Sequence, residues 1–176
     1  ARCNMCSVWE HPTASGEEIE FDVIGKLPRM AFCNITGGEP FVRPDLPELI
    51  QHITETRGIG LIILTNATLF TGSRLQALDG LDRQRVKFQV SLDGSTPALN
   101  DPIRGKGSFE STVAGLRELT RRDFDVTLTT VAIEQNLADL PNLTRLAADC
   151  EVRSQHLMWA HRRGRAAEGS NGCFPR

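Results

Sequence analysis

The 176-residue sequence lacks the long apolar run that a membrane-spanning protein needs. Its longest uninterrupted apolar stretches, such as residues 61–64, are four residues long, whereas a membrane-spanning helix takes ~20 residues. An excess of charge of one sign is also missing, because 20 Lys and Arg stand against 22 Asp and Glu. This slightly acidic balance predicts no nucleic-acid or other polyanion partner. No signal peptide is visible in the first residues.

Cysteine is too scarce and too unevenly spaced for a disulfide framework. There are five cysteines, an odd number, and only Cys3 and Cys6 form a close pair. We expect Cys33 and Cys150 to behave as small buried hydrophobic residues, and the sequence leaves the role of Cys173 open. Two thiols separated by two residues can hold a metal, a cluster or a redox dithiol. The pair alone does not choose among these.

Five short, β-rich apolar runs recur along the chain and predict five strands. They cover residues 30–35, 60–64, 86–92, 126–131 and 156–159. The runs are unbroken rather than alternating, which is typical of strands buried on both faces. Helical patterns fill the gaps, with expected first turns at Asp45, Ser108 and Asn136 and weaker candidates at residues 16–27 and 71–78.

Strands that alternate with helices predict an α/β fold with a parallel sheet and helices outside it. A doubly wound open sheet and a complete or partial barrel both fit this pattern. No Gly-x-Gly-x-x-Gly follows any predicted strand, which argues against a dinucleotide-binding fold. One domain is expected, because no internal linker or repeat is visible.

Polar residues and glycines collect where each predicted strand ends, and these ends share one edge of a parallel sheet. The clusters are residues 36–40, 65–66, 91–94 with 100–105, 129–130 and 161–163. Backbone carbonyls at residues 37–38 can approach an ammonium group beside the Glu39 carboxylate, with Pro40 stiffening the exit. Arg104 suits bidentate pairing with a carboxylate. The edge therefore predicts a ligand with an amino acid moiety.

Taken in order, these motifs resemble the radical S-adenosylmethionine enzymes. Cys3 and Cys6 resemble the last two cysteines of the family's Cys-x-x-x-Cys-x-x-Cys motif. The Gly-Gly-Glu-Pro of residues 37–40 is identical to its glycine-rich motif, and the Thr-Asn-Ala-Thr of residues 65–68 resembles a Thr-Asn-Gly-Thr segment after the third barrel strand.

Later motifs resemble one branch of that family. The Ser-Leu-Asp-Gly of residues 91–94, the segment 100–109 and the Arg-rich residues 161–166 resemble the branch that matures peptides and cofactors. That branch often carries a C-terminal SPASM or twitch extension. The resemblance implies a partial (β/α)6 TIM-like barrel over residues 1–166, with residues 167–176 starting an extension or linker. The first barrel strand, and a cysteine four residues before Cys3, are expected at positions the sequence does not contain.

The resemblance also implies a cofactor site. Cys3 and Cys6 would be two of three thiolate ligands of a [4Fe–4S] cluster, and Met5 would flank the adenine of S-adenosylmethionine. Glu39 and the glycines before it would hold the methionine amine, and Ser91 and Arg104 would lie near the ribose and carboxylate. The implied contacts to this cofactor are Met5, Gly37, Gly38, Glu39, Pro40, Asn66, Ser91, Asp93, Arg104 and Thr130, with Thr129 as the alternative to Thr130.

For the parent protein, the family's chemistry is reductive cleavage of S-adenosylmethionine to a 5′-deoxyadenosyl radical that abstracts hydrogen from a peptide or cofactor precursor. A donor such as flavodoxin or ferredoxin would supply the electron. A reduced cluster and free thiols fit the cytoplasm. With one cysteine position absent, we expect the 176-residue piece itself to be inactive.

Two alternatives remain at this point. The first is a degenerate barrel that binds a ligand or partner without a cluster. The second is a zinc or thiol-redox protein that uses Cys3 and Cys6, with His11 near them. Zinc usually takes four ligands, and the sequence has no second Cys-x-x-Cys.

Overall fold

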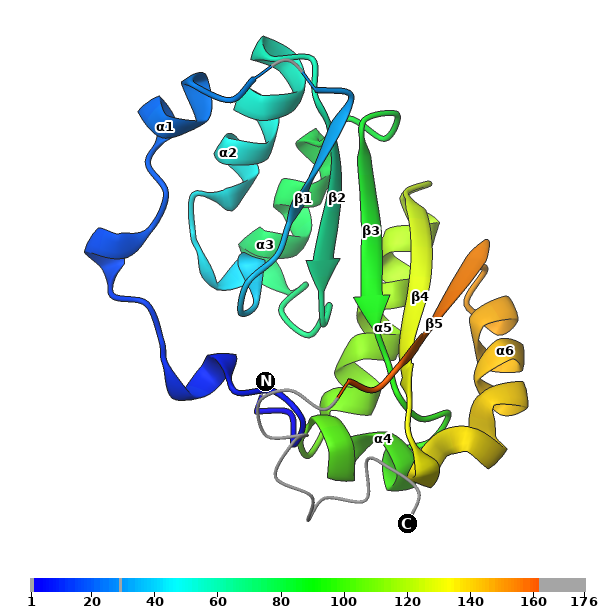
Figure 1. Ribbon diagram of the computed structural model, residues 1–176. Coiled ribbons are helices and arrows are strands. Elements are labelled where there is room, and N and C mark those ends of the chain that lie inside the picture. The colour runs from blue at the N-terminus through cyan, green and yellow to red at the C-terminus, as the bar shows by residue number, and fades with distance from the viewer. Residues whose placement is uncertain (1, 29, 162–176) are drawn as a thin grey trace.

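The computed structural model describes residues 2–28 and 30–161, and these contain one five-stranded sheet. Its strands lie side by side in chain order, and every neighbouring pair is parallel (Figure 1). The strands are β1 (Phe32–Ile35), β2 (Gly60–Thr65), β3 (Val86–Ser91), β4 (Asp125–Ala132) and β5 (Ser154–Trp159). They confirm the five expected strands and the α/β class, as an open segment of a barrel wall.

One helix precedes the first strand, and the others lie between strands. They are α1 (Phe21–Gly25), α2 (Leu46–Gln51), α3 (Gly72–Ala77), α4 (Pro97–Arg104), α5 (Ser108–Arg121) and α6 (Leu140–Asp149). Figure 1 shows α3 and α5 behind the sheet. The longest helix, α5, buries the stripe Val113, Leu116 and Leu119 against it. In the described part of the chain, no helix has the length and apolar character to cross a membrane.

The core lies between the helices and one face of the sheet. Phe88 stands at its centre and is 1% exposed. The rings of Phe41, Phe70 and Phe124 surround it at centroid distances of 6.3, 6.1 and 5.0 Å. Burying one such ring stabilises the fold by about 1.5–3 kcal/mol.

The opposite face of the sheet is open, and the expectation of burial on both faces is wrong for the described residues. Burial alternates along β2 and β3, so that Ile62, Leu64 and Gln89 are only partly buried. The reason is that no helix labelled in Figure 1 crosses this face. At the N-terminal end of the face, Lys87 and Asp125 form an ion pair of 2.7 Å between β3 and β4.

Two local expectations also need correction. The candidate helix at residues 16–27 is reduced to a 3₁₀ turn, Ser15–Glu17, and the short α1. Glu18 and Asp22 stand four residues apart, and like charges at that spacing oppose a helix. Residues 100–105, which the sequence grouped with the end of the third predicted strand, largely belong to α4, which begins at Pro97 and ends before Gly105 at φ +110°.

Candidate functional site

The cysteine loop lies against the C-terminal end of α4. The backbone N–H of Asn4 donates to the Ile103 carbonyl at 2.9 Å, and its side-chain amide donates to the Pro102 carbonyl. Cys3 and Cys6 are free thiols, both partly buried, and the Cys6 N–H donates to the Cys3 carbonyl. Figure 1 shows this N-terminal loop beside α4, at the end of the molecule toward which β2 and β3 point. The two thiols therefore lie at the predicted edge.

Neighbours on both sides fix the loop. The Trp9 indole donates to the Cys3 carbonyl at 3.3 Å, and the Arg2 guanidinium lies 5.6 Å from the Trp9 ring centroid. Met5 packs with a small apolar cluster of residues from α4, β4 and the segments that follow β4 and β5, namely Ile103, Val131, Ile133 and Ala160. Met5 thus joins the cysteine loop to the ends of β4 and β5.

Arg104 and Asp93 form a buried ion pair next to this loop. The Arg104 Nε lies 2.7 Å from Asp93 Oδ2, and the Asp93 side chain is fully buried. Burial is the largest single influence on Arg104 and opposes its charge, but the Asp93 carboxylate and the two nearby cysteines together raise the pKa of the guanidinium above its ordinary value. The sulfurs of Cys3 and Cys6 are close enough to act in the same direction.

Backbone and amide groups hold Asp93 in place. Its Oδ1 accepts the Val131 N–H at 2.8 Å, its N–H donates to Asn100 Oδ1 at 3.0 Å, and its carbonyl accepts from Asn136 at 2.9 Å. Asn136 was expected to start a helix. It is instead buried in a 3₁₀ turn, Glu134–Asp139, because its amide bridges the ends of β3 and β4.

A second carboxylate, that of Asp101, braces α4 against α5. Asp101 accepts hydrogen bonds from the Gly107 N–H at 2.7 Å, the Phe109 N–H at 2.9 Å and the Ser108 hydroxyl at 3.1 Å. These bonds lower the pKa of Asp101, the one from Phe109 most. Ser108 was expected to cap α5. Gly107 occupies the cap position, and Asp101 reaches across from α4 to satisfy the free N–H groups.

The Gly-Gly-Glu-Pro loop follows β1. An added Cβ would meet no atom within 4 Å at Gly37 or Gly38, and Gly37 has φ +135°, so their backbone stays open to a ligand. Pro40 begins a 3₁₀ turn, Pro40–Val42. The Glu39 carboxylate turns the other way, toward the end of β2.

Glu39 ties the ends of β1 and β2 together. Its carboxylate accepts the Thr65 hydroxyl at 2.6 Å, the Asn66 N–H at 2.8 Å and the Phe41 N–H at 3.3 Å. Burial raises the pKa of Glu39, and these three hydrogen bonds only partly offset it. Sequence reasoning placed Glu39 at the site but missed its bonds to β2.

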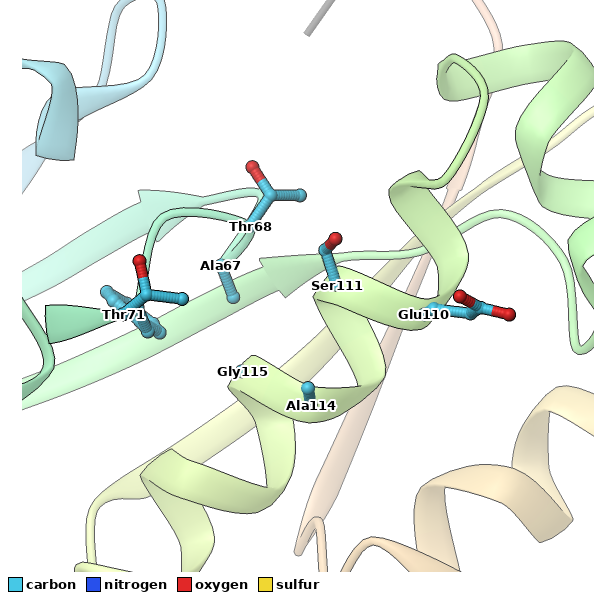
Figure 2. Close-up of a pocket in the computed structure, with 8 residues that line it drawn as sticks. Ala67, Thr68, Thr71, Glu110, Ser111, Ala114 and Gly115 are labelled. Carbon is cyan, nitrogen blue, oxygen red and sulfur yellow. The ribbon is translucent and has the colours of Figure 1, made fainter.

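The Thr-Asn-Ala-Thr turn after β2 rests on α5. Ala67 has φ +55°, a left-handed conformation that favours glycine. The Asn66 carbonyl accepts the Thr112 hydroxyl at 2.9 Å. Figure 2 shows the groove beside this contact, lined by Thr68 and Thr71 on one side and Glu110, Ser111 and Ala114 on the other. None of the residues predicted to bind the cofactor lines it.

The predicted threonines of β4 face opposite sides of the sheet. Thr130 is 1% exposed, and its hydroxyl donates to the Leu92 carbonyl at 2.8 Å on the helix side. Thr129 faces the open side, in register with Ser91 of β3. The alternation of Val126 and Leu128, both in the core, already indicated this parity in the sequence.

The predicted residues thus form two groups at one edge of the sheet. Cys3, Met5, Cys6, Asp93 and Arg104 gather at α4 and the ends of β3 and β4. The glycine loop and Asn66 lie at the ends of β1 and β2. In the described residues no three His, Cys, Asp or Glu side chains meet as a metal site. The two thiols fit two ligand positions of an iron–sulfur cluster, whose preferred protein ligand is thiolate.

A parallel strand–helix sheet with polar residues gathered at its C-terminal edge is the architecture of a segment of a β/α barrel. The model of the Radical SAM superfamily matches residues 1–147. The chain belongs to the Radical SAM superfamily.

Curated relatives show which members of the superfamily the chain is similar to. The chain is 39% identical over 133 residues to mycofactocin maturase MftC of Mycobacterium tuberculosis, which covers 72% of this chain and 32% of the relative. It is 33% identical over 143 residues to the PqqA peptide cyclase of Ruegeria pomeroyi, with coverage of 81% and 37%. It is 32% identical over 135 residues to the AdoMet-dependent heme synthase of Methanosarcina barkeri, with coverage of 76% and 38%. The chain spans about a third of the length of these relatives.

Solved structures share the fold. Streptococcus suis SuiB bound to S-adenosylmethionine superposes with a TM-score of 0.65 at 17% identity, over 80% of this chain and 31% of SuiB. Native anSMEcpe with bound AdoMet gives a TM-score of 0.62 at 13% identity, over 80% of this chain and 40% of that one. At these identities the likeness concerns the fold alone.

Proposed function

We propose that the chain is the core of a radical S-adenosylmethionine enzyme that matures a peptide or cofactor precursor. One observation carries the proposal: the cysteine loop, the Arg104–Asp93 pair and the open Gly37–Gly38 backbone lie at the same edge of one parallel sheet. The relatives named as a maturase and a peptide cyclase support the substrate class.

Each group has a role in this proposal. Cys3 and Cys6 hold two positions of a [4Fe–4S] cluster, and the family pattern places the third cysteine four residues before Cys3. The backbone of Gly37 and Gly38 accepts hydrogen bonds from the methionine amine of S-adenosylmethionine, and Arg104 faces its carboxylate. When bound, the cluster supplies the electron that converts S-adenosylmethionine into a hydrogen-abstracting radical.

The protein residues orient and shield these groups. Asp93 neutralises Arg104 in a buried setting and leaves the other edge of the guanidinium free for a ligand. Met5, with Val131 and Ile103, provides an apolar wall beside the cysteine loop. Glu39 holds the glycine loop by its bonds to β2. We propose an electron donor of the flavodoxin or ferredoxin type as a partner.

Reconstitution of the full-length protein tests the proposal. Anaerobic loading with iron and sulfide is expected to give about four irons per site, with reductant-dependent release of 5′-deoxyadenosine. A folded protein that takes up no iron would overturn the proposal in favour of a non-catalytic barrel. Zinc bound at the two thiols in place of iron would favour the thiol-site alternative.

Cysteine variants assign the ligands. Cys6→Ala is expected to abolish iron uptake and the cluster's visible absorption. Cys33→Ala is the matched control, because Cys33 is partly buried in β1 and burial raises the pKa of its thiol; its iron content should equal that of the wild type. Equal loss of iron in both variants contradicts the assignment.

A further inference from the structure

The ion pair of Arg104 and Asp93 lies directly beside the cysteine loop, because the loop is attached to the last turn of α4. The Asn4 N–H donates to the carbonyl of Ile103, the residue before Arg104, at 2.9 Å. Met5 packs against the small apolar cluster that contains Ile103. Both residues that separate the two cysteines are therefore anchored next to the guanidinium.

Little water surrounds this pair of charges. The Asp93 side chain is 0% exposed and the Arg104 side chain 13%, and their closest atoms are 2.7 Å apart. At the opposite end of β3, Lys87 and Asp125 form a pair of the same length, but their side chains are 56% and 39% exposed. Water and salt screen the exposed pair, whereas buried charges act strongly on their neighbours.

The two charges of the buried pair act on the cysteine loop with opposite signs. Positive charge on Arg104 favours negative charge at the loop, and the Asp93 carboxylate opposes it. The cysteines already interact with the guanidinium, since both Cys3 and Cys6 contribute to the raised pKa of Arg104. Reduction of an iron–sulfur cluster adds one electron, and the charge around a cluster is one of the factors that set its reduction potential.

We propose that Arg104 and Asp93 together set the reduction potential of a cluster held by Cys3 and Cys6, with Arg104 raising the potential and Asp93 lowering it. This inference rests on the proposed function. The electron comes from the donor of the flavodoxin or ferredoxin type, which is oxidised by one electron as the cluster is reduced by one. Asp93 is then a positioning residue that also limits how far the guanidinium favours the reduced state.

The midpoint potential of the cluster tests the inference. It is measured by anaerobic redox titration, followed by electron paramagnetic resonance, on the reconstituted full-length protein without S-adenosylmethionine. Asp93→Asn keeps an oxygen for the Val131 N–H and removes the negative charge, so the potential should rise. Arg104→Gln should lower it. Each change should be about tenfold in the equilibrium constant for reduction, the lower end of what one nearby charge does to an ionisation, or about 59 mV for one electron.

Three further variants separate charge from structure. The double variant Asp93→Asn, Arg104→Gln should return close to the wild-type potential, because it removes both charges. Arg104→Lys keeps the positive charge and should also stay close to the wild type. Asp125→Asn is the matched control, since it removes a carboxylate from the exposed ion pair at the other end of β3, and it should leave the potential unchanged.

An unchanged potential in either single variant, or shifts of the same sign in both, overturns the inference alone. If Asp93→Asn does not fold, Arg104→Gln and Arg104→Lys decide: equal potentials in these two contradict an effect of charge. A wild type that takes up no iron overturns the proposed function, and the inference with it.

Discussion

At the scale of single residues, Glu39 combines two demands that oppose each other. It is a carboxylate held by three hydrogen-bond donors, and it is also buried at the joint between β1 and β2. Burial prevails and raises its pKa. The stability that Glu39 contributes is therefore present below its ordinary pKa and lost as pH rises through the raised value.

Replacing Glu39 exposes this pH dependence. We expect Glu39→Gln to become more stable relative to the wild type as pH rises through the Glu39 pKa. The reason is that the wild type must then bury a charged carboxylate, whereas the variant has no charge at this position. Urea titrations between about pH 4 and 8 measure the difference, with Glu20→Gln, on an exposed segment, as the control. Parallel pH profiles for wild type and Glu39→Gln would contradict this account.

At the scale of elements, the turn after β2 packs directly on the backbone of α5 at Gly115. Among the described glycines, Gly115 is the one where an added Cβ would come closest to another atom. A Cβ at Gly115 would lie 2.2 Å from the Ala67 carbonyl oxygen, and Thr112 bonds to the same turn. The close approach holds the turn, and with it the Asn66 N–H that binds Glu39, at a fixed height above α5.

Gly115→Ala is therefore expected to destabilise the fold by about 1–3 kcal/mol, the usual cost of overpacking, even though alanine favours helices. Chemical denaturation measures the loss. Gly25→Ala, where an added Cβ meets nothing within 4 Å, should be neutral or slightly stabilising. A Gly115→Ala variant as stable as the wild type would show that α5 can move away from the turn at little cost.

At the scale of the whole molecule, stability resides on one face of the sheet. Phe88→Ala is expected to cost about 3–5 kcal/mol, as large core truncations do, because three other rings pack around it. Phe32, on the neighbouring part of the sheet, is 60% exposed, and Phe32→Ala should change the melting temperature little. Similar losses in both variants would mean that the open face is covered in solution.

The sequence predicted the sheet because its strands are short, apolar and regularly spaced, and because the edge residues of a parallel sheet are known to meet. It could not predict how buried polar groups pair. Asn136 looks like a helix start, yet its partners lie on residues 93 and 131; likewise Asp101 finds the N-terminus of α5 only once α4 has formed. Such pairings depend on tertiary geometry, which local patterns do not contain.

Asn4 orders the cysteine loop before any ligand binds to the two thiols. The loop is hydrogen-bonded to α4 through both its backbone and its amide, so the entropy of ordering it is lost during folding of the polypeptide rather than at metal capture. Under the proposed function, a cluster would therefore assemble on a cysteine loop that is already ordered, and the protein without iron would keep this loop folded.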